Sequence, residues 1–314
     1  MDPSNVTPPA PNDAPARAQN PLWPSSDADQ LDAALVAEIR GGSADALEAL
    51  VRRHQAFLYN VAVRFLCSPA DAEDAAQEIL IKAVTKLDSF EGRSSYRTWL
   101  YRIAMNHLRN LRRGQRDFDS WTFDAYGRGL DETPDLDLPD AASVPVDVKL
   151  LVDEARLGCT TGMLLCLDRE QRLVYIIGEI FGATDVVAAE VLEMSRDAFR
   201  QKLSRARRDL HAFMNDKCGL VNPDNPCRCE KKTRAFMAAG YVDPRSLRFA
   251  REHVVTVREV AARALPLLTD SDGLCADVFA AHPFYTPSDL ARRVLQRLEE
   301  PGFRAHFQVG RRSR

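Results

Sequence analysis

Basic side chains are concentrated in two parts of a chain whose formal net charge is −3. The segment SRDAFRQKLSRARRDL, residues 195–210, holds six Arg and Lys residues, and residues 82–116 hold nine against two acids. Between them, residues 114–160 form an acidic connector with eleven acids and four bases. Guanidinium and ammonium groups bind phosphates and the edges of bases. Two basic modules joined by an acidic segment therefore predict that one polyanion is bound at two places, the alternative being two solvated helix faces.

Three of the seven cysteines have a spacing suited to metal binding. Cys218, Cys227 and Cys229 follow one another as C-x8-C-x-C with Asn, Pro and Gly between them, which lets three thiolates reach one tetrahedral ion. Zinc is the metal that such ligands predict first, with copper or a redox role as alternatives. The three thiols could also stay unligated. The candidates for a fourth ligand are His211, His253 and Cys275.

Other chemistry is not indicated. The sequence has no nucleophile–base constellation, no glycine-rich phosphate loop and no HExxH spacing, so we expect no enzyme activity and no required cofactor. The most apolar stretch, Leu173–Leu192, contains three acids, which are costly in hydrocarbon, so we expect no membrane insertion. The N-terminal residues lack a basic start followed by an apolar run, and we expect a cytoplasmic protein.

The elements that must position these residues are helices. Hydrophobic periodicity and modest Gly and Pro content predict an all-α fold. Residues 1–26 contain seven prolines and are expected to be a disordered tail. The further units are a helical domain over 27–116, an acidic linker over 117–160, a helix-turn-helix domain over 161–215 and a mainly helical extension over 216–314. Within the extension, helices are predicted at Arg245–Leu268 and Pro287–Leu298.

In the first module, a helix is predicted to begin after Ser68, with Pro69 at its first position and acids in its first turn. Capping alone would explain those acids, but Gln77 and Glu78 lie beyond the first turn and favour a docking surface. The next helix is predicted to turn Trp99, Leu100 and Ile103 inward. Its arginines alternate with aromatic rings, which suits single-stranded nucleic acid because bases stack on rings while phosphates meet guanidiniums. The alternative is that Trp99 is an ordinary core residue.

In the second module, three helical stretches are predicted over Leu167–Phe213. The second begins at a Thr184 cap, and the turn Glu193–Ser195 leads to the basic helix, one face of which is apolar. Helix, short turn, helix is the geometry that places a recognition helix in the DNA major groove. A stand-alone helix-turn-helix regulator would account for this module, but not for the aromatic and arginine-rich helix or the acidic connector.

Two blocks of the sequence resemble a bacterial RNA polymerase sigma factor of the extracytoplasmic-function (ECF) type. The first contains DAEDAAQE and SSYRTWLYRIA, and the second runs from LDREQR to SRARRDL. The resemblance implies that the DAEDAAQE helix docks on core RNA polymerase, whose beta-prime and beta subunits are the expected partners. It implies that Phe90–Arg113 melts and reads the −10 promoter element, that the helix after Ser195 reads the −35 duplex, and that the acidic linker runs towards the polymerase active-site channel.

The same resemblance assigns candidate site residues. For polymerase binding they are Asp71, Asp74, Gln77 and Glu78. For the −10 element they are Arg93, Ser94, Ser95, Tyr96, Arg97, Trp99, Arg102, Asn106, Arg109, Arg112 and Arg113. For the −35 element they are Ser195, Arg196, Asp197, Arg200, Gln201, Lys202, Arg205, Arg207 and Arg208, with the early positions expected at bases and the last three arginines at phosphates.

Two features depart from a minimal member of this family. Glu193 and Met194 stand in the turn where many relatives carry a glycine. A minimal member would also end near Met214, whereas this chain continues to Arg314. The extension is expected to pack on the sigma modules or on polymerase and to regulate them, in place of or beside a separate anti-sigma factor.

Overall fold

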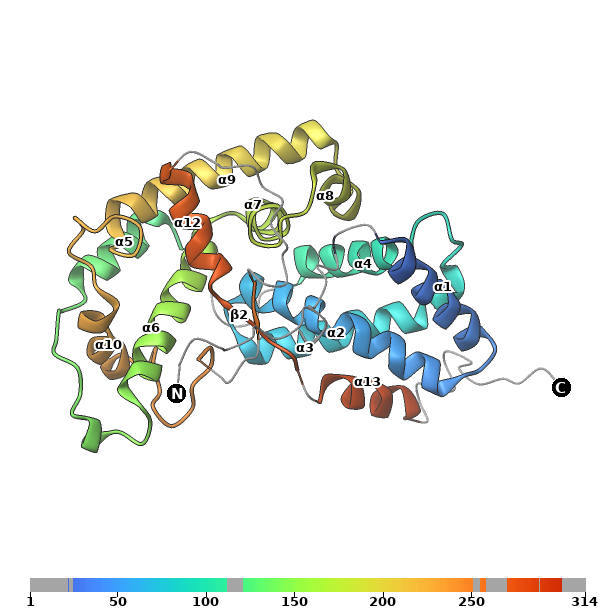
Figure 1. Ribbon diagram of the computed structural model, residues 1–314, viewed down its shortest axis with the longest axis horizontal. Coiled ribbons are helices and arrows are strands. Elements are labelled where there is room, and N and C mark those ends of the chain that lie inside the picture. Colours follow the sequence, from blue (N-terminus) through green and yellow to red (C-terminus); the bar gives the residue numbers. More distant parts are fainter. Residues whose placement is uncertain are drawn as a thin grey trace, which may run out of the picture.

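The computed structural model describes Leu22 and residues 25–111, 121–250, 255–257, 270–287 and 289–300. Nearly all regular structure in these residues is helical, which confirms the predicted all-α class (Figure 1). Within them, the one sheet pairs β1 (Val255–Thr256) with β2 (Pro283–Phe284), antiparallel and two residues long in each strand. Among the helices of these residues, none combines the length and hydropathy needed to span a bilayer.

Four helices make up the first module: α1 (Ser26–Arg40), α2 (Ala44–Leu66), α3 (Pro69–Thr85) and α4 (Tyr96–Asn110), with the short 3-10 turn η1 (Leu87–Ser89) before the loop to α4. The predicted cap at Ser68 is present, since Ser68 Oγ accepts a hydrogen bond from the Asp71 backbone at 3.4 Å. Ser43 caps α2 in the same way, its Oγ accepting from the Ala46 backbone at 3.2 Å. Leu22, within the predicted tail, is 3% exposed and packs in the core. Residues 1–21, 23 and 24 of that tail lie outside the described residues.

The second module contains α7 (Arg169–Tyr175), a π-helical turn (Ile176–Ile180), α8 (Asp185–Leu192) and α9 (Arg196–Lys217). Thr184 Oγ1 accepts a hydrogen bond from the Val187 backbone at 3.3 Å, so α8 begins at the predicted cap. The three-residue turn from Glu193 to Ser195 is also confirmed. Gly178 in the π-helical turn allows α9 to approach closely, since a Cβ there would lie 2.7 Å from the Phe199 ring.

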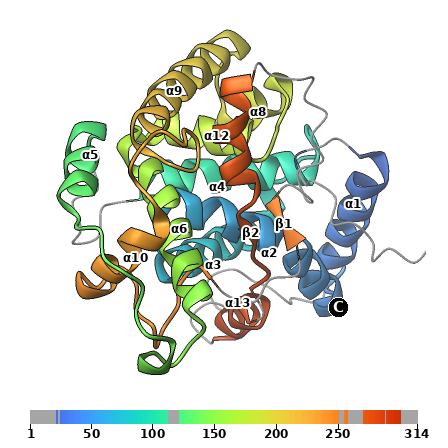
Figure 2. The same ribbon diagram turned by 60° about the vertical axis from the view of Figure 1, so that its left-hand side comes forward.

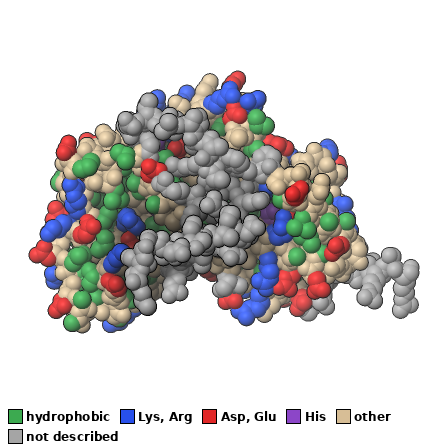
Figure 3. Space-filling model, viewed as in Figure 1, with side chains coloured by type: hydrophobic (Ala, Val, Ile, Leu, Met, Phe, Trp, Pro, Cys, Tyr) green, Lys and Arg blue, Asp and Glu red, His purple; other side chains and the backbone are tan. Residues whose placement is uncertain are grey.

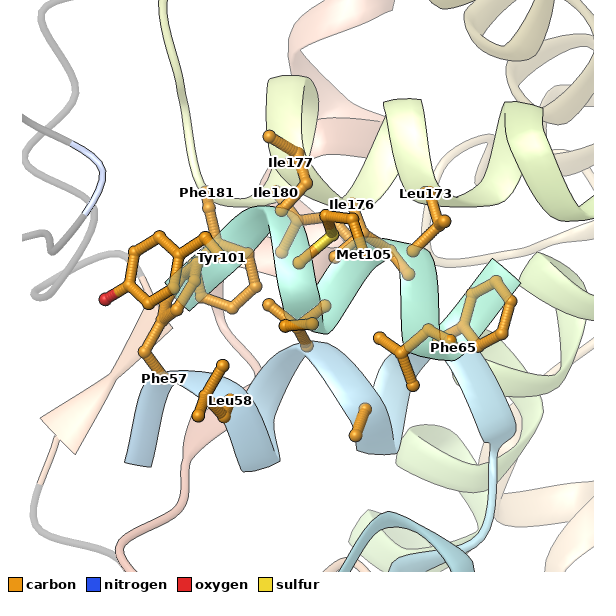
Figure 4. Close-up of a cluster of buried hydrophobic side chains, with 14 of the residues drawn as sticks. Phe57, Leu58, Phe65, Tyr101, Met105, Leu173, Ile176, Ile177, Ile180 and Phe181 are labelled. Atoms are coloured by element: carbon orange, nitrogen blue, oxygen red, sulfur yellow. The ribbon is translucent and has the colours of Figure 1, made fainter. Parts of the chain in front are cut away.

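A shared hydrophobic core joins the two modules (Figure 4). Phe57 and Phe65 of α2 and Tyr101 and Met105 of α4 are at most 2% exposed and face the π-helical turn. The Phe57 ring lies 4.5 Å from Tyr101 and 5.1 Å from Phe181, centroid to centroid. Each such side chain contributes about 1.5–3 kcal/mol when buried, so this core holds the modules against one another.

Arg172 adds a polar tie between the modules. Its Nη1 donates to the Phe65 carbonyl at the end of α2 at 2.9 Å, while Nε donates to Leu164 at 2.9 Å. Nη2 donates to the carbonyls of Leu165 and Leu167, each at 3.0 Å. The Phe65 carbonyl lies in the last turn of α2, where intrahelical donors run out and a positive charge is favourable.

The predicted acidic linker contains regular structure. It includes α5 (Phe123–Glu132), the 3-10 turn η3 (Ala141–Ser143) and most of α6 (Val148–Met163), which crosses the expected boundary at residue 160 and continues into the 3-10 turn η4 (Leu164–Cys166). Helix α6 packs against α10 (Cys229–Ala238) of the extension. Helices α5, α6 and α10 lie on the side of the molecule opposite α1 (Figure 2). Much of the connector is therefore held on the surface as helix.

The extension continues with α12 (Asp270–Ala280) and α13 (Leu290–Glu299). The predicted helix at Pro287–Leu298 is confirmed by α13. The one predicted at Arg245–Leu268 is wrong over 245–250 and 255–256, whereas Val257 is helical and residues 251–254 and 258–268 lie outside the described residues. Residues 245–250 form turns, and 255–256 form β1. The cause is Glu154 of α6, whose carboxylate accepts hydrogen bonds from the backbone N–H groups of Arg248, Phe249 and Ala250 at 2.7–2.8 Å. These three N–H groups therefore donate to a side chain instead of to the backbone carbonyls of a helix.

Candidate nucleic-acid and protein interfaces

Helix α9 has one buried and one basic face. Ser195 caps it, its Oγ accepting a hydrogen bond from the Ala198 backbone at 3.1 Å. Gln201, Arg205 and Arg208 are exposed on the side expected to meet DNA. The buried face is the predicted one, made of Phe199, Leu203, Ala206, Leu210 and Phe213.

The first turn of α9 is held to α8 by an ion-pair cluster. Arg196 Nη2 lies 3.2 Å from Asp185 Oδ2, and Arg200 pairs with the same carboxylate. Partial desolvation raises the pKa of Asp185, but the two guanidiniums outweigh it and hold the pKa below its usual value. The arginine side chains are 55% and 57% exposed, and Asp197 beside them is 86% exposed. This turn is therefore oriented by the cluster while its side chains stay accessible to a ligand.

Arg207, predicted to bind phosphate, is paired within the protein. Its Nε donates to Glu179 Oε2 at 2.6 Å, and Glu179 is 1% exposed in the π-helical turn. Leaving a buried carboxylate without its partner costs several kcal/mol, so Arg207 holds α9 in place, although 31% of its side chain is exposed. Lys202 is likewise paired, 2.7 Å from Glu170 of α7, with about a third of its side chain exposed (35%).

Glu193, in the turn before α9, has a left-handed backbone. Its φ is 53° and its ψ 49°, a region that costs a residue with a Cβ roughly 1–2 kcal/mol. Glu193 therefore adopts a backbone conformation that glycine, expected at this turn, would adopt freely. The Glu193 carboxylate accepts a hydrogen bond from Asn106 Nδ2 of α4, so the strained residue also joins the two modules.

Three of the predicted −10 residues face α8. Arg102 donates from Nε to the Glu190 carbonyl and from Nη2 to the Glu190 carboxylate, both at 3.0 Å. Arg109 Nη2 donates to the Leu192 carbonyl at 3.0 Å, and Asn106 bonds the turn as described. Their polar groups are therefore engaged by α8 and the turn after it, although the Arg102 side chain is still 34% exposed. Residue types alone did not point to Glu190 as the partner of Arg102.

Tyr96 and Arg97 correct the −10 set because both are buried. Tyr96 is 4% exposed, and its ring lies 5.7 Å from Phe90 and 5.6 Å from Trp99. Burial raises its pKa far above the usual value for tyrosine. Arg97 is 8% exposed and pairs with Asp29, because α1 packs over this end of α4. Trp99 is only partly buried, so its ring keeps an accessible part.

The loop before α4 is open. Arg93 is 85% exposed and lies 3.0 Å from Glu91. Ser94 Oγ donates to the Ser95 carbonyl at 3.3 Å, and Ser95 Oγ caps α4 by accepting the Thr98 backbone N–H at 3.2 Å. Ser95 thus has a structural role that its predicted contact with DNA would have to share. Two further predicted residues, Arg112 and Arg113, lie outside the described residues.

The predicted docking face of α3 is accessible. Asp71, Asp74 and Glu78 are exposed and Gln77 is half-buried, while the opposite face of the helix is buried alanine, isoleucine and leucine. Glu78 Oε2 lies 4.0 Å from Lys82 Nζ, an exposed pair of little energetic weight. The polar residues therefore form a surface that capping does not explain.

The three cysteines of the predicted metal site are neighbours. Cys218 and Cys227 meet across a backbone bridge, and Cys229 is the first residue of α10. Burial raises the pKa of Cys229 to about 12, and the two other thiols add to the rise. Among the described residues, however, no three His, Cys, Asp or Glu side chains are placed to hold a metal ion, so the arrangement does not fit a ligand set and metal binding stays a prediction. Of the candidates for a fourth ligand, His211 bonds Tyr175 in the core, Cys275 is buried, and His253 lies outside the described residues.

Comparisons with known proteins find sigma factors. Residues 50–118 match the family model for Sigma-70 region 2. RNA polymerase sigma-H factor of Pseudomonas aeruginosa is 30% identical over 181 residues, which cover 56% of this chain and 90% of that protein. RNA polymerase sigma factor CnrH of Cupriavidus metallidurans is 31% identical over 189 residues, covering 60% and 95%. The ECF RNA polymerase sigma-E factor of Escherichia coli is 42% identical over 79 residues, covering 25% of this chain and 41% of that protein.

A solved structure of CnrH in complex with the cytosolic domain of CnrY is also similar. It is 28% identical and covers 59% of this chain and 97% of that chain, with a TM-score of 0.42.

Proposed function

Since this chain belongs to the RNA polymerase sigma factors of the ECF type and directs transcription initiation, we propose how its helices divide that work. The −35 duplex is bound by α9, with α8 and the Glu193–Ser195 turn setting its angle. Gln201, Arg205 and Arg208 are the exposed contacts, and Arg196 and Arg200 transfer from Asp185 to DNA. The observation that carries this assignment is the helix–turn–helix with one exposed basic face, in the same chain as a sigma-70 region 2.

The −10 element is bound as a separated strand along α4 and the loop before it. Arg102, Asn106 and Arg109 supply phosphate and base contacts once α8 has moved away, and the accessible part of Trp99 offers a ring for stacking. Arg93 extends from the open loop towards the same strand. This assignment makes the α4–α8 contact a closed state that promoter binding must open.

The partner that opens this state is core RNA polymerase, in the cytoplasm. The docking face is α3, through Asp71, Asp74, Gln77 and Glu78, and the beta-prime and beta subunits are the surfaces it meets. The connector after α5 runs towards the polymerase channel, where its carboxylates lie in the path of RNA phosphates. The chain itself supplies binding energy and strand separation, and the chemistry of RNA synthesis belongs to polymerase.

A stand-alone helix-turn-helix regulator is the alternative function. It would use α8 and α9 in the same way, but it gives no role to the exposed acidic face of α3 or to the polar side of α4. The sigma-70 region 2 match covers α3 and α4. It therefore favours a sigma factor over a stand-alone regulator.

Binding of the full-length chain to bacterial core polymerase tests the docking assignment. We expect the double variant Asp74→Lys and Glu78→Lys to weaken binding at least tenfold, because two of the exposed contacts are reversed in charge. Asp88→Lys is the matched control, an exposed acid of the same module in η1, and should change affinity less than twofold. Equal effects of the two changes would refute the role of α3, and no binding by the unmodified chain would refute polymerase docking altogether.

A further inference from the structure

Helix α13, at the far end of the chain, lies beside the proposed docking residues of α3. Arg293 Nη2 is 2.8 Å from Glu73 Oε2, and α13 packs on both α2 and α3. In the space-filling view, basic and acidic side chains adjoin at the lower edge, where Figure 1 places α13 (Figure 3). A groove runs between the helices, lined on α3 by Asp74, Gln77 and Glu78 and on α13 by Arg293, Gln296 and Arg297.

The seat of α13 is well packed. Its apolar face is Leu290, Ala291, Val294 and Leu298, each 6% exposed or less. Gln55 of α2 is 5% exposed, and its Oε1 accepts a hydrogen bond from the Ala291 backbone at 3.0 Å. Because buried polar groups need hydrogen-bond partners, this bond indicates a specific contact between α2 and α13.

The backbone of β2 and of Tyr285, which precedes α13, is also hydrogen-bonded to buried side chains of α2. Asn60 is fully buried; its Nδ2 donates to the Tyr285 carbonyl at 2.7 Å and its Oδ1 accepts from the Tyr285 backbone at 3.0 Å. Arg64 is 1% exposed and donates from Nη2 to the Pro283 carbonyl at 2.9 Å. Burial lowers the pKa of Arg64 to about 10, so it stays charged at neutral pH and needs such acceptors. Helix α2 of the first module therefore has three buried polar residues, Gln55, Asn60 and Arg64, that bond the extension.

We propose that α13 is an intrachain competitor for core polymerase, which rests on the docking role proposed for α3. A stable protein interface buries about 800 Å² on each partner, a patch of about 16 Å radius. A polymerase surface centred on Asp74 and Glu78 would reach across the shared groove and meet α13. Arg293 and Arg297 also set positive charge beside the acids that a partner would contact. Polymerase therefore binds the form of the chain in which α13 has left its seat.

Charge reversal on α13 of the full-length protein tests this competition. Arg293→Glu turns the attraction to Glu73 into repulsion, and we expect binding to core polymerase to tighten about threefold to tenfold. Arg292→Glu is the matched control, since it makes the same charge change on the same helix and its ion pair is with Asp289, three residues earlier. It should leave the affinity within twofold. Weaker binding by the Arg293 variant would make α13 part of the docking surface, and unchanged binding would make it a bystander; either result overturns the proposal.

Hydrogen exchange of the unmodified protein gives an independent readout. On adding core polymerase, amides of α3 should gain protection while those of α13 lose it. If α3 and α13 are both protected in the complex, polymerase binds with α13 seated and the competition is refuted. If α3 gains no protection although a complex forms, the docking assignment fails first. The two failures are therefore distinguishable.

Discussion

Replacing Arg172 by Met should destabilise the protein by about 3–5 kcal/mol. The guanidinium donates four hydrogen bonds, at 2.9–3.0 Å, to carbonyls at the ends of helical segments in both modules. It also lies over the Phe65 ring, 5.2 Å from its centroid. Burial lowers the pKa of Arg172 to about 10, so the side chain is charged at neutral pH and all four bonds are charge-assisted.

The magnitude follows from opposing terms. Hydrogen bonds to a charged group contribute about 1.5–3 kcal/mol each, so four would total roughly 6–12 kcal/mol. Desolvating the guanidinium offsets several kcal/mol of that sum, and methionine keeps much of the packing. The net loss is comparable to a large part of the 5–15 kcal/mol that typical domains possess. Arg172→Lys should recover only part of it, because an ammonium has three donors for four carbonyls.

Urea unfolding followed by circular dichroism measures this loss directly. Arg205→Met is the matched control, since Arg205 is exposed on α9, and it should change stability by less than about 0.5 kcal/mol. At about 2–4 °C per kcal/mol for a large domain, the Arg172 variant should also melt roughly 6–20 °C lower. A loss below about 1 kcal/mol would refute the view that Arg172 ties α2 to the second module.

Four further predictions follow from the site. Glu193→Gly should be about 1 kcal/mol more stable to urea than Glu193→Ala, because only glycine relaxes the left-handed backbone; equal stability would contradict the strain. Glu190→Gln should raise affinity for a short single-stranded oligonucleotide about two- to fivefold, whereas unchanged anisotropy titrations would mean that α8 does not limit access to α4. Asp32 of α1 is buried next to His54 and Arg53 of α2. Burial raises the pKa of Asp32, but the hydrogen bonds and charges of these two residues outweigh it and hold the pKa below its usual value. Its stabilisation is therefore present above about pH 4 and lost as the pH falls through the folded-state value, and Asp32→Asn should flatten the acid limb of a melting-temperature profile. The cysteine spacing predicts that the unmodified chain retains one zinc ion in native mass spectra and that Cys227→Ser loses it, whereas the placement of the described side chains predicts no ion; an unmodified chain without metal would refute the zinc site.

Features fixed by neighbouring residues were predictable from sequence. The caps at Ser43, Ser68 and Thr184 depend on a side-chain oxygen and a backbone N–H three residues later. The buried face of α9 depends only on helical periodicity. For the same reason, Asp71, Asp74 and Glu78 of α3 lie on an exposed polar face, as their spacing indicates, while docking stays a prediction.

Features fixed by packing between distant elements were not predictable. Arg97 and Arg207 have the residue type of a DNA contact, yet they pair with Asp29 and Glu179 of the protein itself. Their partners lie 68 and 28 residues away, and no local pattern marks the pairing. Glu154 acts in the same way on the chain near residue 249, where three backbone donors are diverted from the predicted helix.

Permanganate footprinting of promoter DNA tests the central claim most directly. Fragments of the host genome would be mixed with the full-length chain, with its matched core polymerase, and with both. The account predicts unpaired thymines at a −10 element, with protection of duplex near −35, only when both proteins are present. Tight duplex binding by the chain alone, with no opening when active core polymerase is added, would contradict it.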